Sequence, residues 1–314
     1  MEFTKISIVI PVYNEEENIH LLLQGIETAL ADWNYEIIIV DDGSTDGTRK
    51  AVTRAIHSKI KLVELYKNFG QTPAIAAGID QAGGEIIITM DGDLQNDPED
   101  IPHMVKILFD GDFDVVAGVR TNRKDGLILR KIPSKIANGL IRYMTGVKLH
   151  DYGCTLKVFR KEIADNLGLH GELHRFIPVL AHIQGARLTE IPVKHHPRKY
   201  GSTKYGIGRT FKVVSDLILI IFFQKYLNKP MHVFGTLGIL TFLAGTAISI
   251  YLLFLKILGE EIWGRPLMIL GITLILGGVQ LITFGLLSEL VIRIYFEARN
   301  KKPYRIRKIH EHAL

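Results

Sequence analysis

The sequence predicts an α/β domain with a doubly wound parallel sheet, followed by a helical segment and two membrane-spanning helices. Two observations support this fold class. Short β-branched runs alternate with helical segments over roughly the first two hundred of the 314 residues. From about Val233 the composition changes to Leu, Ile, Gly, Phe and Thr, with long stretches that lack charge.

Five nearly continuous apolar runs are expected to form parallel strands whose two faces are both covered. They span residues 6–12, 36–40, 61–65, 85–90 and 114–117. Between them, Asn14 and Glu17 match a capping box, and Asp97-Pro98 matches a helix start. The alanine-rich residues 71–82 favour a helix by propensity.

Polar residues follow three of these strands directly: residues 11–15, Asp41-Asp42-Gly43-Ser44 and Asp91-Gly92-Asp93. Ligands bind beyond the carboxyl ends of strands in such sheets, so these segments are expected to share one edge. Clustered carboxylates repel one another unless a metal or hydrogen-bond donors neutralise them. Hard oxygen ligands suit Mg²⁺ or Mn²⁺ bound together with substrate phosphates. The pattern therefore predicts a metal–diphosphate site at Asp91 and Asp93.

The formal net charge of +5 indicates an anionic partner. Nucleic acid is not expected, because the basic residues gather at the flanks of the apolar stretches. Cys154 is the only cysteine, which excludes an intramolecular disulfide and a thiolate metal cluster, and we interpret it as a packing residue. The N-terminus leads directly into a strand without a signal peptide, so the polar part is expected to stay in the cytosol.

Residues 233–255 and 267–288 contain no charged residue, and each stretch can cross about 30 Å of hydrocarbon. Their outer flanks are basic and the loop between them is short and balanced in charge. The positive-inside rule therefore predicts an integral protein of the plasma (inner) membrane with both termini cytoplasmic. Glycines in both spans allow close helix packing, and the oligomeric state, a homo-oligomer included, stays open.

Residues 209–226 show apolar side chains at helical spacing, which indicates either an amphipathic helix in the membrane interface or a domain-packing helix. We therefore expect four parts. They are a globular domain over residues 1–207, a juxtamembrane helix region over 208–231, two transmembrane helices over 232–292 and a basic cytoplasmic tail over 293–314.

Several motifs together resemble family 2 glycosyltransferases of the GT-A (Rossmann-like) fold, and among them the polyprenyl-phosphate glycosyltransferases. The matching segments are residues 9–15 (VIPVYNE), 40–46 (VDDGSTD), 90–95 (MDGDLQ), 114–120 (DVVAGVR) and 197–205 (PRKYGSTKY). The chain is similar to dolichol-phosphate mannose synthase and to bacterial undecaprenyl-phosphate glucosyl and aminoarabinosyl transferases. The similarity runs from residue 5 to about 210, and the two-span tail suits the bacterial branch.

The resemblance implies an inverting transfer of a hexose from a nucleotide sugar to polyprenyl phosphate, with Mg²⁺ or Mn²⁺ as cofactor. We expect glucose from UDP-glucose, which the bacterial two-span relatives often use. GDP-mannose, UDP-N-acetylglucosamine and UDP-aminoarabinose are the alternative donors.

The resemblance also implies roles for individual residues. Those expected to line the nucleotide base and ribose are Pro11, Tyr13, Glu15 and Asp41 or Asp42. Asp91 would face the ribose and diphosphate, Asp93 and Gln95 would complete the metal site with it, and Arg198 and Lys204 would approach the diphosphate. Those expected to hold the acceptor phosphate are Arg120, Arg130 and Ser134. Asp151, in DYGCTL where many relatives have GDFRL, is expected to act as a sugar ligand or base.

Two other readings stay open. A processive polysaccharide synthase of the same fold would carry a Gln-X-X-Arg-Trp motif and more spans, and the sequence has neither. A non-catalytic scaffold or flippase component for lipid-linked sugars would not need the acidic strand ends.

Overall fold

The structure of the chain is a computed structural model. It describes residues 4–120, 139, 141–142, 145–169, 173–197, 199, 230–297 and 306–310. The chain forms two compact units, Met1–Leu217 with Lys302–Leu314 and Ile218–Lys301. The predicted juxtamembrane helix lies almost entirely outside the described residues.

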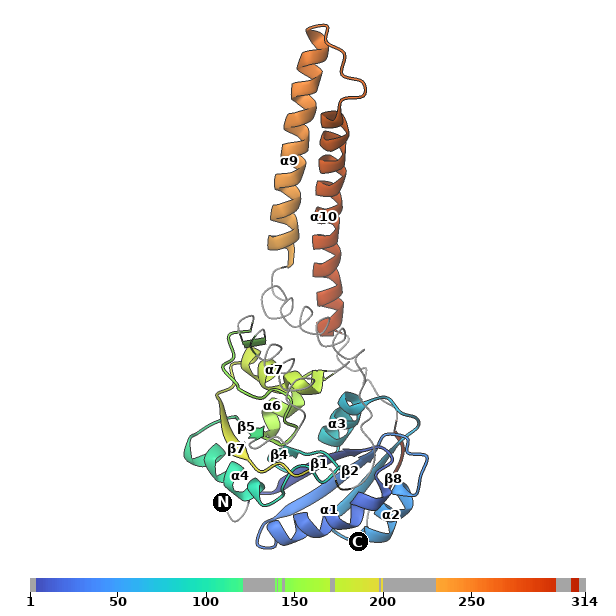
Figure 1. The fold of residues 1–314 in the computed structure, drawn as a ribbon, viewed down its shortest axis with the longest axis vertical. Coiled ribbons are helices and arrows are strands. Elements are labelled where there is room, and N and C mark those ends of the chain that lie inside the picture. The colour runs from blue at the N-terminus through green and yellow to red at the C-terminus, as the bar shows by residue number, and fades with distance from the viewer. Residues whose placement is uncertain are drawn as a thin grey trace. The chain divides into compact units, whose positions relative to one another are not determined.

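One sheet of the first unit has the strand order β7-β5-β6-β4-β1-β2-β3-β8 (Figure 1). The strands are β1 Ile6–Val12, β2 Tyr35–Asp41, β3 Ile60–Leu65, β4 Ile86–Thr89, β5 Val115–Arg120, β6 Lys157–Arg160, β7 Leu188–Val193 and β8 Ile306–His310. Strands β4, β1, β2 and β3 are parallel neighbours, and β5 is parallel to β7. All five predicted strands are confirmed.

Two strands that the sequence did not predict make the sheet mixed. β6 lies between β4 and β5 and is antiparallel to both of them. β8, which follows the apolar helices in sequence, pairs antiparallel with the edge strand β3. Neither pairing is visible in a local pattern, because a strand's neighbours are set by long-range packing and not by its own residues.

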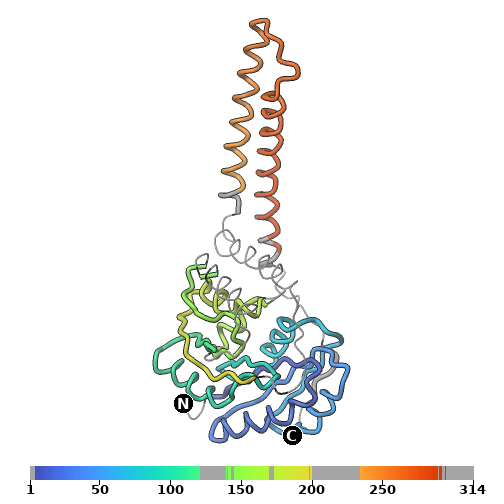
Figure 2. Tube along the Cα trace, viewed as in Figure 1, coloured from blue at the N-terminus to red at the C-terminus, as the bar shows by residue number. Residues whose placement is uncertain are grey.

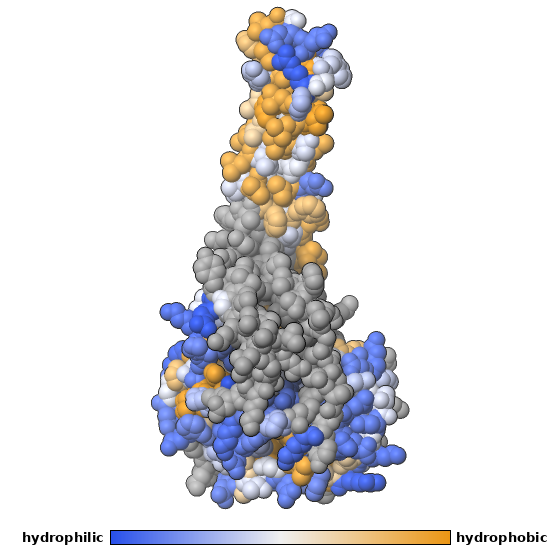
Figure 3. Space-filling model, viewed as in Figure 1, coloured by the Kyte–Doolittle hydropathy of each residue, from blue (hydrophilic) through white to orange (hydrophobic). Residues whose placement is uncertain are grey.

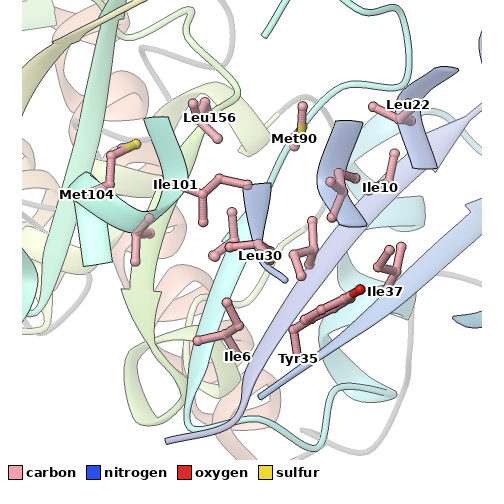
Figure 4. Packing of buried hydrophobic residues seen from close by; sticks show 14 of the residues in the cluster. Ile6, Ile10, Leu22, Leu30, Tyr35, Ile37, Met90, Ile101, Met104 and Leu156 are labelled. Atoms are coloured by element: carbon pink, nitrogen blue, oxygen red, sulfur yellow. The ribbon is translucent and has the colours of Figure 1, made fainter. Parts of the chain in front are cut away.

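Helices cover both faces of the sheet. On one face lie α1 Glu16–Ala29, α2 Thr48–Ala55 and α4 Asp100–Asp110, and their apolar side chains form a core with the strands. Figure 4 shows part of this core, where Leu22 of α1 and Ile101 of α4 lie near Ile10, Met90 and Leu156. On the other face lie α3 Gln71–Asp80, α6 Lys161–Asp165, the 3₁₀ helix η2 Leu173–Phe176 and α7 Ile177–Ile183. These layers confirm the doubly wound arrangement.

The helix starts agree with the sequence only in part. The helix over residues 71–82 is confirmed as α3. The capping box is wrong, because α1 has Glu15 at its N-cap without a side-chain cap bond, and the Asn14 side chain accepts instead from the Thr45 N–H at 2.8 Å. Asp97 accepts from the Glu99 N–H at 3.0 Å, just before α4 begins at Asp100.

The second unit is a pair of helices, α9 Pro230–Ile257 and α10 Pro266–Glu297, which lie side by side in Figures 1 and 2. Both contain a stretch long and apolar enough to cross a membrane, Phe234–Ile257 and Pro266–Ser288. In the most apolar part of each stretch only 17% and 11% of the residues are buried, which argues against core helices. Their outer surfaces are mainly hydrophobic in Figure 3.

Glycines set the close approach of these two helices. A Cβ on Gly278 would lie 2.6 Å from the Phe242 backbone nitrogen, and one on Gly245 would lie 2.7 Å from the Gly271 carbonyl oxygen. Gly277 has no atom within 4 Å of such a Cβ, so it faces away from this contact. The expectation that glycines allow close packing is therefore confirmed within the pair.

Candidate active site

The three polar strand ends do lie at one edge of the sheet. Val12 at the end of β1 is in register with Asp41 at the end of β2, and the Asp42 N–H donates to the Val12 carbonyl at 2.9 Å. On the other side of β1, the Met90 N–H donates to the Val9 carbonyl at 3.2 Å. The parallel order β4-β1-β2 thus brings both acidic turns beside the loop after β1, as the sequence predicted.

The loop after β1 is fastened to the turn after β2. Asn14 has a φ of 52°, its N–H donates to Ser44 Oγ at 2.9 Å, and the Glu15 N–H donates to Thr48 Oγ1 at 2.8 Å. Glu15 also accepts from the Asn18 side chain at 2.6 Å. Pro11 lies within β1, and both Pro11 and Tyr13 are half-buried at this edge. Their contacts with a nucleotide stay predictions.

The carboxylates of Asp41 and Asp42 are bound by the protein itself. Asp41 is fully buried and accepts from the Ser44 N–H at 3.2 Å and from Arg49 Nε at 2.5 Å. Asp42 accepts from the N–H groups of Phe69 at 2.7 Å and Gly70 at 2.9 Å. Burial, helped by the charge of Asp41 and opposed by these N–H groups, raises the pKa of Asp42 to about 6.

This bonding gives Asp41 and Asp42 a structural function that the sequence did not suggest. Asp41 orders its own turn, and Asp42 orders the start of α3. In the structure both carboxylates form hydrogen bonds that hold neighbouring segments in place. A role for either residue in binding the base or ribose stays a prediction.

The Asp91-Gly92-Asp93 turn is held by side chains from other elements. Asp91 Oδ1 accepts from Gln71 Nε2 at 2.7 Å, and the Asp91 N–H lies 3.5 Å from Asn96 Oδ1. A Cβ on Gly92 would lie 2.7 Å from Val12 Cγ1, so this position needs glycine. Burial and the neighbouring charge of Asp93 raise the pKa of Asp91 to about 6, while Thr155 and Lys157 lower it.

The residues after Asp93 turn sharply. Leu94 adopts a φ of 61°, which is rare for a side chain of its shape, and the Gln95 N–H donates to Asp93 Oδ1 at 3.2 Å. The Gln95 carbonyl accepts from the His196 N–H at 2.9 Å, and Asn96 forms a bridge with His195. Strain of this kind is found where a turn must present its side chains in one geometry. The segment before Arg198 therefore lies beside the acidic turn.

Arg120 and Asp151 form an ion pair at the end of β5. Arg120 Nε and Nη2 donate to the two Asp151 oxygens at 2.7 and 2.8 Å, and the Gly153 N–H donates at 3.0 Å. A Cβ on Gly153 would lie 2.7 Å from Arg120 Nη2, so this glycine makes room for the guanidinium. The sequence motifs assign the two residues to different substrates, so their pairing was not predicted. The roles expected of Asp151 on the sugar and of Arg120 on the acceptor phosphate stay predictions.

Two residues near the acidic turn were missed by the sequence analysis. Gln71 begins α3 and contacts Asp91 directly. Lys157 begins β6, is 1% exposed and donates to the Cys154 carbonyl. Burial lowers the pKa of Lys157, whereas the charges of Asp151 and Asp91 oppose that change. A lysine flanked by the apolar residues 156 and 158–159 was a usable signal in the sequence.

The donor set fits a hard divalent cation. Asp91 and Asp93 would supply carboxylate oxygens, and Gln95 would add an amide oxygen from the same turn. Among the described residues, no group of three or more His, Cys, Asp and Glu side chains is placed to hold a metal. Two carboxylates and an amide suit a cation that takes its remaining ligands from phosphates and water. Arg130, Ser134, Arg198 and Lys204 lie outside the described residues.

Comparison with known proteins identifies the family. The profile described as glycosyl transferase family 2 matches residues 7–168, which contain both acidic turns and the Arg120–Asp151 pair. The chain is a family 2 glycosyltransferase. The resemblance seen in the sequence, the enzyme class and the GT-A fold are thereby confirmed.

Two relatives of this glycosyltransferase match it over nearly its whole length. It is 47% identical over 316 residues to a dodecaprenyl-phosphate galacturonate synthase from Rhizobium johnstonii, covering 98% of this chain and 93% of the relative. It is 37% identical over 312 residues to an undecaprenyl-phosphate 4-deoxy-4-formamido-L-arabinose transferase from Yersinia enterocolitica, covering 97% and 93%. The matched lengths include the paired apolar helices.

A solved structure has the same fold as this glycosyltransferase. Glucosyl-3-phosphoglycerate synthase from Mycobacterium tuberculosis, in complex with Mn²⁺, UDP-glucose and phosphoglyceric acid, superposes with a TM-score of 0.55. The match covers 71% of this chain and 80% of that chain at 16% identity, so it supports the fold alone.

Proposed function

We propose that this glycosyltransferase moves a sugar from a nucleotide diphosphate to a polyprenyl phosphate at the cytoplasmic face of the inner membrane, with Mg²⁺ or Mn²⁺ bound by Asp91, Asp93 and Gln95. The observation that carries the proposal is the acidic turn after β4, beside the loops after β1 and β2, in a chain related over its whole length to polyprenyl-phosphate transferases.

The donor side is supported by chemistry at this edge. When bound, the metal would offset the negative charge that grows on the diphosphate as its bond to the sugar breaks. Gln71 fixes one oxygen of Asp91, so that carboxylate is already oriented when the donor enters. The fold neighbour crystallised with Mn²⁺ and UDP-glucose binds them on the same fold.

The acceptor side is supported by Arg120 and by the membrane helices. The ion pair with Asp151 uses two of the five guanidinium N–H groups of Arg120, which leaves further N–H groups that can donate to a phosphate. A phosphate acceptor is already anionic, so it needs a cation more than a base. Two helices that can cross a membrane would keep the enzyme close to a lipid acceptor.

The sugar is the least constrained part of the proposal. The relatives' names refer to galacturonate and to 4-deoxy-4-formamido-L-arabinose, and neither refers to glucose. We therefore rank a UDP-linked uronic acid first, because the galacturonate synthase is the more similar of these two relatives. A UDP-linked aminoarabinose derivative comes second, and the expected UDP-glucose stays a donor to be tested.

A donor screen tests this function. The full chain in detergent receives a short polyprenyl phosphate, Mn²⁺ and one of UDP-galacturonate, UDP-4-deoxy-4-formamido-L-arabinose, UDP-glucose, UDP-N-acetylglucosamine or GDP-mannose. Mass analysis should find a polyprenyl-phosphate sugar with one donor, and excess chelator should abolish it. Transfer to a growing glycan instead would favour the processive reading, and no product with any donor would favour the scaffold reading.

A further inference from the structure

The acidic turn after β4 and Arg120 belong to strands that are not neighbours. The turn follows β4 and Arg120 ends β5, and β6 lies between these two strands in the sheet. Because β6 is antiparallel to both of them, it begins at the edge where β4 and β5 end. The segment that leads into β6, residues 151–156, therefore runs between the acidic turn and Arg120. It includes Asp151, the partner of Arg120.

One residue of this segment, Thr155, is bonded to the chain on both sides of the acidic turn. Its carbonyl accepts from Thr89 Oγ1 at 2.8 Å, and Thr89 is the last residue of β4, two positions before Asp91. Its hydroxyl donates to Asn96 Oδ1 at 3.0 Å, and Asn96 comes after the turn. Thr155 thus joins the two ends of residues 90–95, which contain the proposed metal ligands.

These bonds are shielded from water. Thr89 is 1% and Asn96 is 4% exposed, and Thr155 is half-buried. Asn96 is also held through its backbone, by an antiparallel bridge with His195. A buried polar group that loses its partner stays unsatisfied, so buried hydrogen bonds hold their partners firmly in place. The base of the acidic turn is therefore fixed to the segment that carries Asp151.

The same segment is fixed to β5 as well. Asp151 accepts from Arg120 Nε and Nη2 at 2.7 and 2.8 Å. Five residues further on, the Leu156 carbonyl accepts from the Gly118 N–H at 3.0 Å. Residues 151–156 thus bond to the end of β5 and, through Thr155, to both sides of the acidic turn. This short segment sets the spacing between the acidic turn and Arg120.

Transfer between two bound substrates depends on such a spacing. Reacting atoms must approach to about 3–3.5 Å, and a misplacement of about 1 Å can lower the rate about 10²-fold. We propose that Thr155 is a positioning residue, whose two hydrogen bonds hold the acidic turn, and with it the donor, at a fixed distance from the Arg120–Asp151 pair. The inference rests on the proposed function, in which the donor binds at the acidic turn and the acceptor phosphate at Arg120. It assigns Thr155 no contact with either substrate.

The test removes the hydroxyl bond and measures binding and transfer separately. Thr155→Val keeps the branched shape without the hydroxyl, and Thr155→Ser keeps the hydroxyl. The full chain in detergent receives a short polyprenyl phosphate, Mn²⁺ and UDP-galacturonate, or the donor that replaces it in the screen above. Thr155→Val should lower kcat about tenfold and leave both KM values within about twofold of the wild type. Calorimetry should find unchanged binding of UDP with Mn²⁺, because the acidic turn itself stays intact. Thr155→Ser should transfer at the wild-type rate.

Asn96→Ala breaks the same bond from its acceptor side and should likewise lower kcat. The double variant of Asn96→Ala and Thr155→Val should be no slower than the slower single variant, because both changes act on one bond. A merely structural role predicts instead that kcat, UDP binding and the temperature of unfolding fall together.

Thr28→Val is the matched control. The Thr28 hydroxyl also donates to a backbone carbonyl, that of Gln24 at 2.8 Å, near the C-terminal end of α1. The same loss of a hydroxyl there should leave the rate of transfer and the binding of UDP unchanged.

Four results overturn the inference. They are a wild-type kcat in Thr155→Val, weakened binding of UDP with Mn²⁺ in that variant, a Thr155→Ser variant as slow as Thr155→Val, and a double variant whose loss multiplies the two single losses. The first of these can be read from Asn96→Ala as well. A wild type that gives no product with any donor would instead remove the proposed function itself.

Discussion

The two acidic turns of this enzyme look alike in the sequence and differ in the structure. Asp41-Asp42 and Asp91-Gly92-Asp93 each follow an apolar strand, and β2 and β4 lie on either side of β1. The first pair is bonded to backbone N–H groups and to Arg49, which fasten loops together. In the second, Asp91 is oriented by the Gln71 side chain, and Asp93 accepts from the Gln95 N–H of its own turn.

The difference shows that a carboxylate's function depends on what already binds it. A carboxylate that accepts several fixed N–H bonds is part of the scaffold, because a ligand would have to replace those bonds. A carboxylate that is oriented by a side-chain amide, as Asp91 is, keeps lone pairs for a cation. We therefore expect a mainly structural role for the turn after β2 and propose that the chemistry takes place at the turn after β4.

The largest expected effect comes from the turn after β4. Asp93→Ala should lower the rate of sugar transfer at least about 10²-fold, because a metal ligand is lost where charge develops on the diphosphate. Turnover and Mn²⁺ binding measured on the same preparation check this. Undiminished transfer by Asp93→Ala would contradict the proposal that the turn after β4, and not the turn after β2, carries the chemistry.

A smaller effect is expected from the residue that orients Asp91. Gln71→Leu should lower turnover about tenfold, because the Asp91 carboxylate loses the hydrogen bond that orients it, and a hydrogen bond to a charged group is worth about 1.5–3 kcal/mol. Gln81→Leu, at the other end of α3, is the control and should behave as the wild type. Equal rates for the two variants would mean that Gln71 does not orient the carboxylate.

The turn after β2 should respond mainly in stability. Asp41→Asn weakens the bond to Arg49, which is only 28% exposed, and should destabilise the domain by about 2 kcal/mol. Thermal unfolding measures this loss, while Mn²⁺ affinity should stay unchanged. A stable variant with weakened nucleotide binding would instead support the predicted base or ribose contact.

The smallest effect is a pH dependence at Asp42. Its pKa is raised to about 6 in the folded chain, against about 3.9 when unfolded, so between these values the folded state alone holds the proton. The stability from this group is complete below about pH 4 and is lost as the pH rises through about 6. Asp42→Asn should therefore lose less stability than the wild type between pH 5 and 7.5, by about 1.4 kcal/mol. An equal loss in both proteins would contradict the assignment.

Much of the fold followed from local patterns. The strands from β1 to β5 and helix α3 were predictable because their apolar or alanine-rich runs are long enough to be distinctive. The strands β6 and β8 were not predicted, because β6 has four residues and β8 pairs with β3 from the far end of the chain. The misassigned cap at Asn14 has the same origin, since its side chain bonds Thr45 of another loop.

The candidate site divides in a similar way. The acidic turns and Arg120 could be located from the sequence, because the ends of the predicted strands and the resemblance to the family were enough to find them. Gln71 and the partner of Arg120 are separated in sequence from the groups they contact, so no spacing rule could find them.

The sequence by itself determined the family, the α/β class, the two apolar helices and the acidic turns, because each depends on residues close together in the chain. Only the tertiary structure decided which acidic turn is bonded to the scaffold, that Arg120 is paired with Asp151, and that Lys157 is buried within the sheet. These outcomes depend on which strands become neighbours, and that neighbourhood sets both the hydrogen bonds and the burial of each charge.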